Sequence, residues 1–212
     1  MNIDREKIFV FGASGHSKVV IDIIEQQHRF DIALLADDDE TIKDSCTCGY
    51  RIIGGKEELL ASSIRYGLVA IGNNKARLEV ASWLSDHGFE LISAVHPVAQ
   101  LARSVIIGAG TVVMAGAVVN SDSRIGNNVI INTRASIDHD CVIGDGVHIA
   151  PGAILCGSVS VGKGTFICAG ATIIPNITIG TNAVIGAGSV VIKNVSDNVR
   201  VVGNPARIVH EE

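Results

Sequence analysis

An aliphatic side chain recurs at every sixth position through the second half of the chain. The series has no break and consists of Ile107, Val113, Val119, Ile125, Ile131, Ile137, Ile143, Ile149, Leu155, Val161, Ile167, Ile173, Ile179, Ile185 and Val191. A helix needs a hydrophobic period of about 3.6 residues and a half-buried strand needs a period of 2, so neither element explains this spacing. A six-residue period predicts a β-solenoid with three short strands per coil and an inward-pointing aliphatic column on each wall.

Two further patterns accompany the aliphatic series. A small or β-branched residue stands four positions after each aliphatic, as at Thr111, Ala117 and Ser123. Glycine follows every third aliphatic, at Gly108, Gly126, Gly144, Gly162 and Gly180. The full repeat is therefore eighteen residues, and we expect equivalent positions of successive coils to stack about 4.8 Å apart.

Residues 1–95 lack this repeat and alternate between strand-like and helix-like segments. Strands are expected at Lys7–Phe11, Ile32–Ala36, Leu68–Ile71 and Phe89–Val95, and helices at Lys18–Gln27, Glu57–Ser62 and Lys75–His87. Such alternation predicts βαβ units and a small parallel, Rossmann-like sheet. The predicted organisation is an α/β domain over 1–95 and a parallel β-helix with a C-terminal tail over 96–212, with His96-Pro97 as the boundary turn.

Polar loops follow three of the expected strands, at Gly12–His16, Asp37–Asp38 and Gly72–Asn74. Ligands of parallel sheets bind outside the carboxyl ends of the strands. A Gly-x-x-Gly step before a helix can cradle a phosphate, because glycine admits the ligand and the helix offers free N–H groups. The alternative is a tight turn that needs glycine for positive φ. Convergence of three polar loops favours a ligand site.

The densest set of polar residues in the solenoid consists of Asn132, Thr133, Asp138, His139, Asp140 and His148. His139 stands two residues after the wall residue Ile137, so we expect it at or near a corner. A histidine beside a carboxylate is a candidate general base, since the carboxylate fixes the tautomer and raises the basicity. The alternative is an inert surface histidine. One coil is eighteen residues, so His139 and Gly157 should be neighbours on successive coils, as should Asn120, Asp138 and Cys156.

Composition and charge argue against several classes of partner and against metal binding. The net charge is −5 and no run of Lys or Arg occurs, which disfavours nucleic acid and anionic membranes as partners. No apolar stretch approaches the length of a membrane span, and the charged start is unlike a signal peptide. The five cysteines include Cys46 and Cys48 but no second pair, so we expect no metal site and a reduced, cytoplasmic protein.

Several strings are similar to those of a known family: Phe11-Gly-Ala-Ser-Gly-His16, Ala70-Ile-Gly-Asn-Asn74, Ile131-Asn-Thr133, Ile137-Asp-His-Asp-Cys-Val-Ile-Gly144, His148-Ile-Ala-Pro-Gly152 and Gly203-Asn-Pro-Ala206. They cover both halves of the chain. The chain resembles the nucleotide-sugar acetyltransferases of the left-handed β-helix superfamily, especially bacillosamine- and perosamine-type N-acetyltransferases and sialic-acid O-acetyltransferase-like proteins. The resemblance implies left-handed coils, a homotrimer with active sites between subunits, and acetyl-CoA as co-substrate without a metal.

The resemblance also implies roles for particular residues. Nucleotide-sugar binding would fall on Ser14, Gly15, His16, Asp37, Asp38, Gly72 and Asn73. His139 would be the general base, and Asp140 would raise its basicity in place of the glutamate of some relatives. His148 would contact the acetyl thioester. Gly157, Ala169 and Ala187 match backbone positions of the CoA groove, and the Pro205 turn would fold the tail over the last coil.

The function predicted is acetyl-CoA-dependent N-acetylation of a nucleotide-linked amino sugar. O-acetylation of a sugar or sialic acid would use the same base and stays open, as does the choice among UDP, GDP and dTDP. A carbonic-anhydrase-like β-helix needs three zinc-binding histidines, and the hexads contain only His139 and His148. We also predict a subunit interface formed by exposed aliphatics next to the inward column: Ile106, Val112, Val118 and Ile130.

Overall fold

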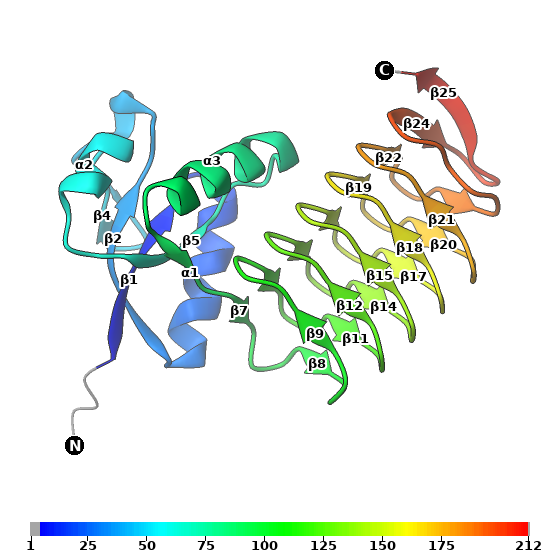
Figure 1. The fold of residues 1–212 in the computed structure, drawn as a ribbon, viewed down its shortest axis with the longest axis horizontal. Coiled ribbons are helices and arrows are strands. Elements are labelled where there is room, and N and C mark those ends of the chain that lie inside the picture. Colours follow the sequence, from blue (N-terminus) through cyan, green and yellow to red (C-terminus); the bar gives the residue numbers. More distant parts are fainter. Residues whose placement is uncertain (1–4, 212) are drawn as a thin grey trace. The chain divides into compact units, whose positions relative to one another are not determined.

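The computed structural model describes residues 5–211, which form two compact units that divide between Pro97 and Val98 (Figure 1). The expected boundary after residue 95 therefore lies after Pro97, and the His96-Pro97 step belongs to the first unit. A turn follows there, at Pro97 and Val98. Among the described residues, no helix is both long enough and apolar enough to cross a bilayer.

The first unit is built on a small parallel sheet. Its strands are β1 (Glu6–Phe11), β2 (Phe30–Ala36), β5 (Tyr66–Val69) and β6 (Glu90–Leu91), in the order β2-β1-β5-β6. All three pairings are parallel, as the alternation of strands and helices predicted. The connecting helices are α1 (Gly15–Gln27), α2 (Lys56–Ala61) and α3 (Asn74–Asp86).

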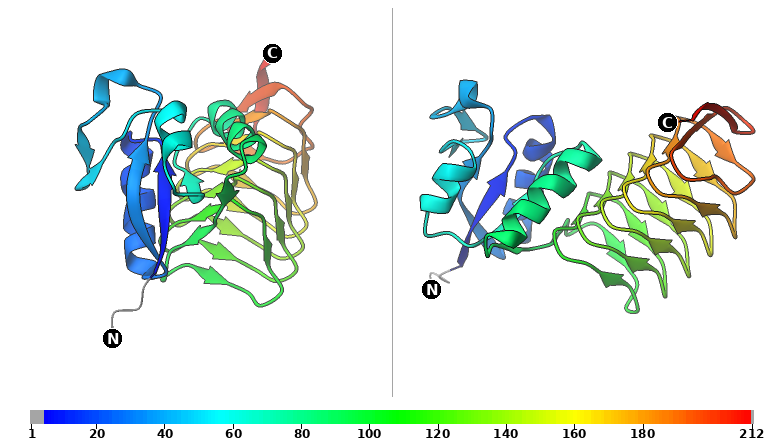
Figure 2. Two further views of the ribbon diagram at one scale, coloured as in Figure 1. Left: turned by 60° about the vertical axis from the view of Figure 1, so that its left-hand side comes forward. Right: turned by 45° about the horizontal axis from the view of Figure 1, so that its top comes forward.

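Both faces of this sheet are covered by helices (Figure 2). Phe9 and Phe11 of β1 point to one face, where they pack against side chains of α2 and α3, including Leu59, Val80 and Leu84. Ile8 and Val10 alternate to the other face because successive strand residues point in opposite directions. Helix α1 contributes its own buried residues Val20, Ile21, Ile23 and Ile24.

Three short elements differ from the sequence prediction. The single strand expected at Phe89–Val95 is two strands, β6 and β7 (Ala94–Val95), with Ile92 and Ser93 outside both. A hairpin of β3 (Cys46–Thr47) and β4 (Tyr50–Arg51) and a 3₁₀ helix, η1 (Glu40–Ile42), lie between β2 and α2. These two-residue and three-residue elements are too short to carry a hydrophobic period, so the sequence gives no signal for them.

The second unit is a β-solenoid of two-residue strands, as predicted. Strands one coil apart pair in parallel with a shift of eighteen residues, for example Ile130 with His148 and Ser136 with Ile154. The first wall contains β10 (Val112–Val113), β13 (Ile130–Ile131), β16 (His148–Ile149), β19 (Phe166–Ile167) and β22 (Val184–Ile185).

The other two walls follow the same repeat. The second wall contains β8 (Gln100–Leu101), β11 (Val118–Val119), β14 (Ser136–Ile137), β17 (Ile154–Leu155), β20 (Thr172–Ile173) and β23 (Val190–Val191). The third contains β9 (Ile106–Ile107), β12 (Arg124–Ile125), β15 (Val142–Ile143), β18 (Ser160–Val161) and β21 (Thr178–Ile179). At the C-terminal end, β24 (Val199–Val202) pairs with β22 and, antiparallel, with β25 (Arg207–Glu211).

The aliphatic series points inward, and every member is buried except the half-buried Ile107. The glycine column permits close stacking of coils at one corner. A Cβ on Gly126 would lie 2.5 Å from Asp145 Oδ1 and 2.9 Å from the carbonyl carbon of Gly144. A Cβ on Gly162 would lie 2.5 Å from the carbonyl carbon of Gly180. A side chain in this column would therefore force successive coils apart.

The corners follow a rule that our sequence reasoning missed. The residue three positions after each aliphatic has positive φ at every corner from Gly110 to Gly188. Glycine, asparagine or aspartate occupies twelve of these fourteen positions, because these residues adopt the left-handed conformation at least cost. The exceptions are Arg134 (φ 57°) and Ser158 (φ 59°).

One expectation about the surface is wrong. Val112 and Ile130 were expected to be exposed, but each is 1% exposed within the single chain. Val118 is half-buried, and Ile106 is 56% exposed. The larger exposed aliphatics of the second and third walls are Ile154 (45%) and Val142 (50%), together with Ile106. A hydrophobic interface would therefore use those walls more than the first.

Candidate active site

His139 lies at the corner between the second and third walls, after β14 and before β15. Its Nδ1 is 2.8 Å from Asp140 Oδ2, and both side chains are 58% exposed. Asp140 is the corner residue of this turn, with φ 60°. Aspartate tolerates this conformation better than most residues. Asp140 therefore closes the turn and supplies the carboxylate partner of the histidine.

Neighbouring coils hold the His139 corner in place. Asn120 Nδ2, one coil earlier, donates to Asp138 Oδ1 at 2.9 Å, and the same oxygen accepts the His139 N–H at 2.9 Å. Gly157, one coil later, lies directly against the ring, since a Cβ there would be 2.7 Å from His139 Cε1. Two pairs of coil-to-coil neighbours expected from the eighteen-residue repeat, His139 with Gly157 and Asn120 with Asp138, are thus in contact.

The charges around His139 favour its protonated form. The hydrogen bond to Asp140, followed by the negative charge of Asp138, raises the pKa of His139 above its ordinary value. Hydrogen bonds from Asn120 and from the His139 N–H lower the pKa of Asp138. Because a carboxylate only accepts, Nδ1 of neutral His139 carries the proton and Nε2 is the basic atom.

Cys141 has a structural role at the same corner. It is fully buried, and its Sγ donates to the Cys156 carbonyl at 3.3 Å. Ser123, at the equivalent position one coil earlier, makes the same bond from its hydroxyl to the Asp138 carbonyl at 2.8 Å. Burial also raises the pKa of the Cys141 thiol. An inward thiol with a raised pKa is a poor nucleophile.

His148 is the centre of a second cluster, on the first wall. Its Nε2 is 3.1 Å from Asn132 Nδ2, while Asn132 Oδ1 accepts the Thr133 N–H at 2.8 Å. The Thr133 bond fixes the amide so that its NH₂ group faces the histidine. The ring of His148 packs against Phe166, with 4.8 Å between ring centroids. Phe166 is the only Phe, Trp or Tyr after Phe89 in the sequence.

The two histidine clusters occupy different sides of the solenoid. His139 and Gly157 share the corner between the second and third walls, whereas His148 lies on the first wall, half a coil further along the chain. Ala169 and Ala187, both exposed, share the corner that follows the first wall. An entire wall therefore separates the two clusters within one chain.

The loop between β1 and α1 brings its backbone close to Ala70 and leaves the start of α1 open. Gly12 has φ 107°, and a Cβ there would lie 2.8 Å from the Ala70 carbonyl oxygen. Ser14 caps α1 without a side-chain hydrogen bond, and a Cβ on the exposed Gly15 would meet nothing within 4 Å. The first N–H groups of α1 are thus accessible to an anion.

The other two polar loops are tied to the protein by their own side chains. Asp37 Oδ2 accepts the Ala13 N–H at 2.7 Å, and its Oδ1 accepts the Asp39 N–H at 3.0 Å. Asp38 pairs with Lys56 at 3.1 Å. Asn73 caps α3 by accepting the Ala76 N–H at 3.0 Å, next to Gly72. These residues hold the loops at the sheet edge as well as being candidate ligand contacts.

Arg77 is a residue that sequence reasoning missed. It is only 1% exposed and lies on the buried face of α3, with Val80, Ala81 and Leu84. The signal was available, because Arg77 stands three, four and seven positions before these apolar residues. His16 is close enough that the Arg77 charge, after burial, contributes to lowering the pKa of His16 to about 4.

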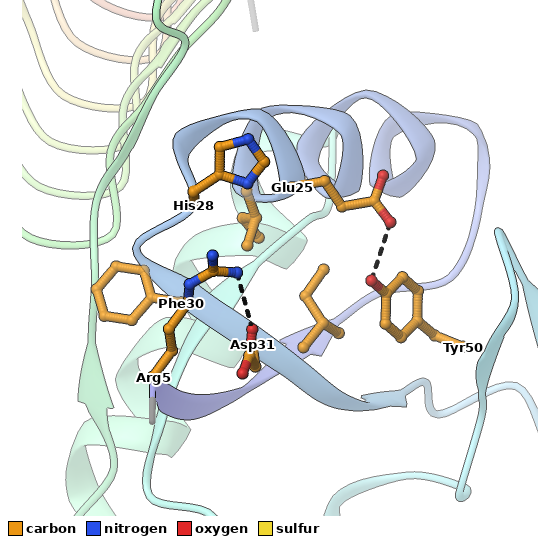
Figure 3. Close-up of a pocket in the computed structure, with 8 residues that line it drawn as sticks. Arg5, Glu25, His28, Phe30, Asp31 and Tyr50 are labelled. Atoms are coloured by element: carbon orange, nitrogen blue, oxygen red, sulfur yellow. Dashed lines mark hydrogen bonds and ion pairs between the residues drawn. The ribbon is translucent and has the colours of Figure 1, made fainter. Parts of the chain in front are cut away.

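A pocket of about 420 Å³ lies elsewhere in the first unit, between α1, β2 and Tyr50 (Figure 3). Tyr50 donates to Glu25 at 2.9 Å, and Arg5 pairs with Asp31 at 3.3 Å. Burial and the hydrogen bond to Glu25 raise the pKa of Tyr50 to about 12. None of the residues with a predicted role lines this pocket. Within residues 5–211, no group of three or more His, Cys, Asp or Glu side chains could hold a metal.

Two family descriptions match the two units. Residues 7–84 match the PglD N-terminal domain, and residues 122–157 and 158–193 match the bacterial transferase hexapeptide (six repeats). A small parallel-sheet domain joined to a hexapeptide solenoid defines a class of bacterial acyltransferases.

Similar proteins identify the branch of this class. The chain is 38% identical to PerB from Caulobacter crescentus, solved with CoA and GDP-perosamine (96% and 97% of the chains covered, TM-score 0.92). It is 36% identical to the acetyltransferase domain of PglB from Neisseria gonorrhoeae, solved with acetyl coenzyme A (97% and 100%, TM-score 0.90). UDP-N-acetylbacillosamine N-acetyltransferase of Bacillus subtilis is 38% identical over 114 residues, about half of each chain (52% and 52%). The chain belongs to the family of nucleotide-sugar N-acetyltransferases that these proteins represent.

Proposed function

We propose that the protein transfers the acetyl group of acetyl-CoA to the amine of a nucleotide-linked amino sugar. The observation that carries the proposal is the His139–Asp140 pair, held against Gly157 at an exposed corner of the solenoid. The similarity over 96% of the chain to PerB, which was solved with CoA and GDP-perosamine, supports this substrate class. O-acetylation is less well supported. The Bacillus subtilis relative described above is an N-acetyltransferase by name, and so is GDP-perosamine N-acetyltransferase of Escherichia coli O157:H7, which is 34% identical over 122 residues.

His139 acts as the general base in this proposal. An amine attacks only in its neutral form, so Nε2 of His139 accepts a proton as the sugar nitrogen bonds to the thioester carbonyl carbon. A backbone N–H donates to the oxyanion of the tetrahedral intermediate. When the C–S bond breaks, the leaving CoA sulfur takes the proton from the imidazolium. No acyl-enzyme is needed, since both substrates are held together and Cys141 is buried.

The two units divide the binding of the substrates. In the first unit, the α1 N-terminus at Ser14–His16 and the loops of Asp37, Asp38, Gly72 and Asn73 hold the nucleotide-sugar. In the solenoid, His148 contacts the acetyl thioester, and the backbone at Gly157, Ala169 and Ala187 lines the CoA groove. No metal takes part.

The active protein is a homotrimer with sites between subunits. His139 and His148 lie on different sides of one solenoid, so one chain alone does not bring the base and the thioester contact together. A neighbouring copy can place its His148 wall against the His139 corner. The exposed Ile106, Val142 and Ile154 supply apolar area for such association.

An assay of CoA release tests the proposed function. The protein is incubated with acetyl-CoA and a panel of UDP-, GDP- and dTDP-linked amino sugars, together with the matching hydroxy sugars. The proposal expects CoA release with at least one amino sugar, and a product that has gained one acetyl group by mass spectrometry. Release only with hydroxy sugars would establish O-acetylation instead. Release with neither class would reject the proposed activity.

A further inference from the structure

Arg77 carries a charge into the interior of the first unit. Its side chain is 1% exposed, and burial lowers its pKa to about 10, so the guanidinium remains charged at neutral pH. Burial of a charge has a large desolvation cost unless hydrogen bonds compensate for it. The contacts of Arg77 therefore indicate what the buried charge is used for.

The guanidinium is bonded to the loop between β5 and α3. Nη1 donates to the Ile71 carbonyl at 3.0 Å and to the Gly72 carbonyl at 3.1 Å, and Nη2 donates to Asn74 Oδ1 at 2.9 Å. A planar guanidinium suits such a set of acceptors, whereas a lysine ammonium is a single point donor. Arg77 thus fixes the shape of the Gly72–Asn74 loop at the carboxyl end of the sheet.

The Gly72–Asn74 loop lies next to the start of α1. A Cβ on Gly72 would lie 4.0 Å from the Cβ of His16, which is in the first turn of α1. Burial and the Arg77 charge together keep His16 neutral at physiological pH. The open N-terminus of α1 and a fixed guanidinium therefore both lie near His16. The α1 N-terminus and the Arg77 guanidinium both attract an anion. The guanidinium acts through a poorly solvated region, where charges are weakly screened.

We propose that Arg77 is a positioning residue for the diphosphate of the nucleotide-linked substrate. It holds the Gly72–Asn74 loop opposite the N-terminus of α1, and its buried charge raises the local affinity for a dianionic group. The guanidinium itself stays bonded to the loop. This inference rests on the proposed function, because it concerns the same nucleotide-binding edge.

Isothermal titration separates an electrostatic role from a merely structural one. UDP, GDP and dTDP are each compared with the matching nucleoside, using wild type, Arg77→Met, Arg77→Lys and Arg65→Met. Arg65 is the matched control, since it is an exposed arginine just before β5, at the opposite end of that strand. Loss of the buried charge should weaken binding of the preferred diphosphate about tenfold or more, while the matching nucleoside changes less than about twofold.

The remaining variants sharpen the comparison. Arg77→Lys should weaken the diphosphate less than Arg77→Met does, because it keeps the charge, and Arg65→Met should leave both ligands unaffected. Equal losses of nucleoside and diphosphate would overturn the proposal and make Arg77 a structural residue. If circular dichroism shows that Arg77→Met does not fold, Arg77→Lys is used instead. The comparison is again between the loss of diphosphate affinity and the loss of nucleoside affinity. Failure of the wild type to bind any of UDP, GDP and dTDP would instead reject the proposed nucleotide site itself.

Discussion

His139 and Asp140 form the smallest element of the proposed active site, and a hydrogen bond of 2.8 Å joins their side chains. The carboxylate raises the pKa of the histidine, which makes it a stronger base once deprotonated. The same shift means that the neutral form is lost at a higher pH than in an ordinary histidine. Activity should therefore fall as the pH drops through this raised pKa.

Asp140→Asn tests this relation. Without the carboxylate the pKa of His139 falls, so the acid limb of the pH–rate profile should move to lower pH while the maximal rate decreases. Asp122→Asn is the matched control, because Asp122 is the corner residue one coil earlier (φ 63°). The profile of the control should coincide with wild type. An unshifted acid limb in Asp140→Asn would contradict the role given to Asp140.

Arg134 is a strained residue at the corner between the first and second walls. The equivalent residues of other coils are Gly116, Gly152, Gly170 and Gly188. A left-handed conformation costs an L-residue roughly 1–2 kcal/mol, while glycine loses about 0.4–1 kcal/mol more chain entropy on folding. Arg134→Gly should therefore stabilise the protein by about 0.5–1 kcal/mol in denaturant unfolding. Gly152→Ala should destabilise it by a similar amount, and a stabilised Gly152→Ala would refute the strain argument.

At the scale of elements, most of the solenoid could be predicted from the sequence because its pattern is strict. The aliphatic column, the glycine column and the small residues each recur at a fixed position of the coil, because each position has its own steric limit. The preference for Gly, Asn or Asp three positions after most of the aliphatics is also present in the sequence. Its meaning became clear only from the positive φ values at these corners. The repeat also placed Gly157 beside His139 correctly, since eighteen residues separate them.

The first unit was less predictable at its edges. Strands β1, β2 and β5 and all three helices carry long apolar patterns and appear where expected. The split of residues 89–95 into two strands and the β3–β4 hairpin have no such pattern. Side-chain bonds within the loops, such as that of Asp37 to the Ala13 N–H, depend on tertiary contacts that no local spacing encodes. The burial of Val112, which was expected to be exposed, has no signal in the local spacing either.

Gly157→Ala tests how the coils position His139, the proposed base. Its backbone tolerates alanine, but the new Cβ would stand 2.7 Å from His139 Cε1, so the ring must move. We expect kcat to fall by about tenfold or more, with little change in the KM for acetyl-CoA, because small misplacement of a catalytic group is costly. In a His139→Ala background the same substitution should have no further effect. Additive losses would show that Gly157 acts independently of His139.

At the scale of the whole molecule, the separation of the two histidine clusters predicts shared active sites. His139→Ala and His148→Ala should each be poorly active as pure proteins. Mixed trimers contain some sites that combine an intact His139 from one subunit with an intact His148 from the next. Mixing the two variants under conditions that allow subunit exchange should therefore restore part of the wild-type rate.

Sites within one chain would give no such recovery. Sedimentation of the wild type should show a trimer at micromolar concentration, and a monomer would remove the basis for shared sites. Wild type mixed with His139→Ala under the same exchange conditions is the control for the effect of diluting intact subunits with an inactive variant.

The central claim is that His139 is the base for acetyl transfer to a sugar amine. The most direct measurement is the steady-state rate of His139→Ala with acetyl-CoA and the amino sugar identified by the panel assay, alongside CoA affinity by titration. Loss of a general base should lower kcat by a factor of about 10² to 10⁴ and leave CoA binding within about twofold of wild type. A variant that retains more than about a tenth of the wild-type rate would contradict the account.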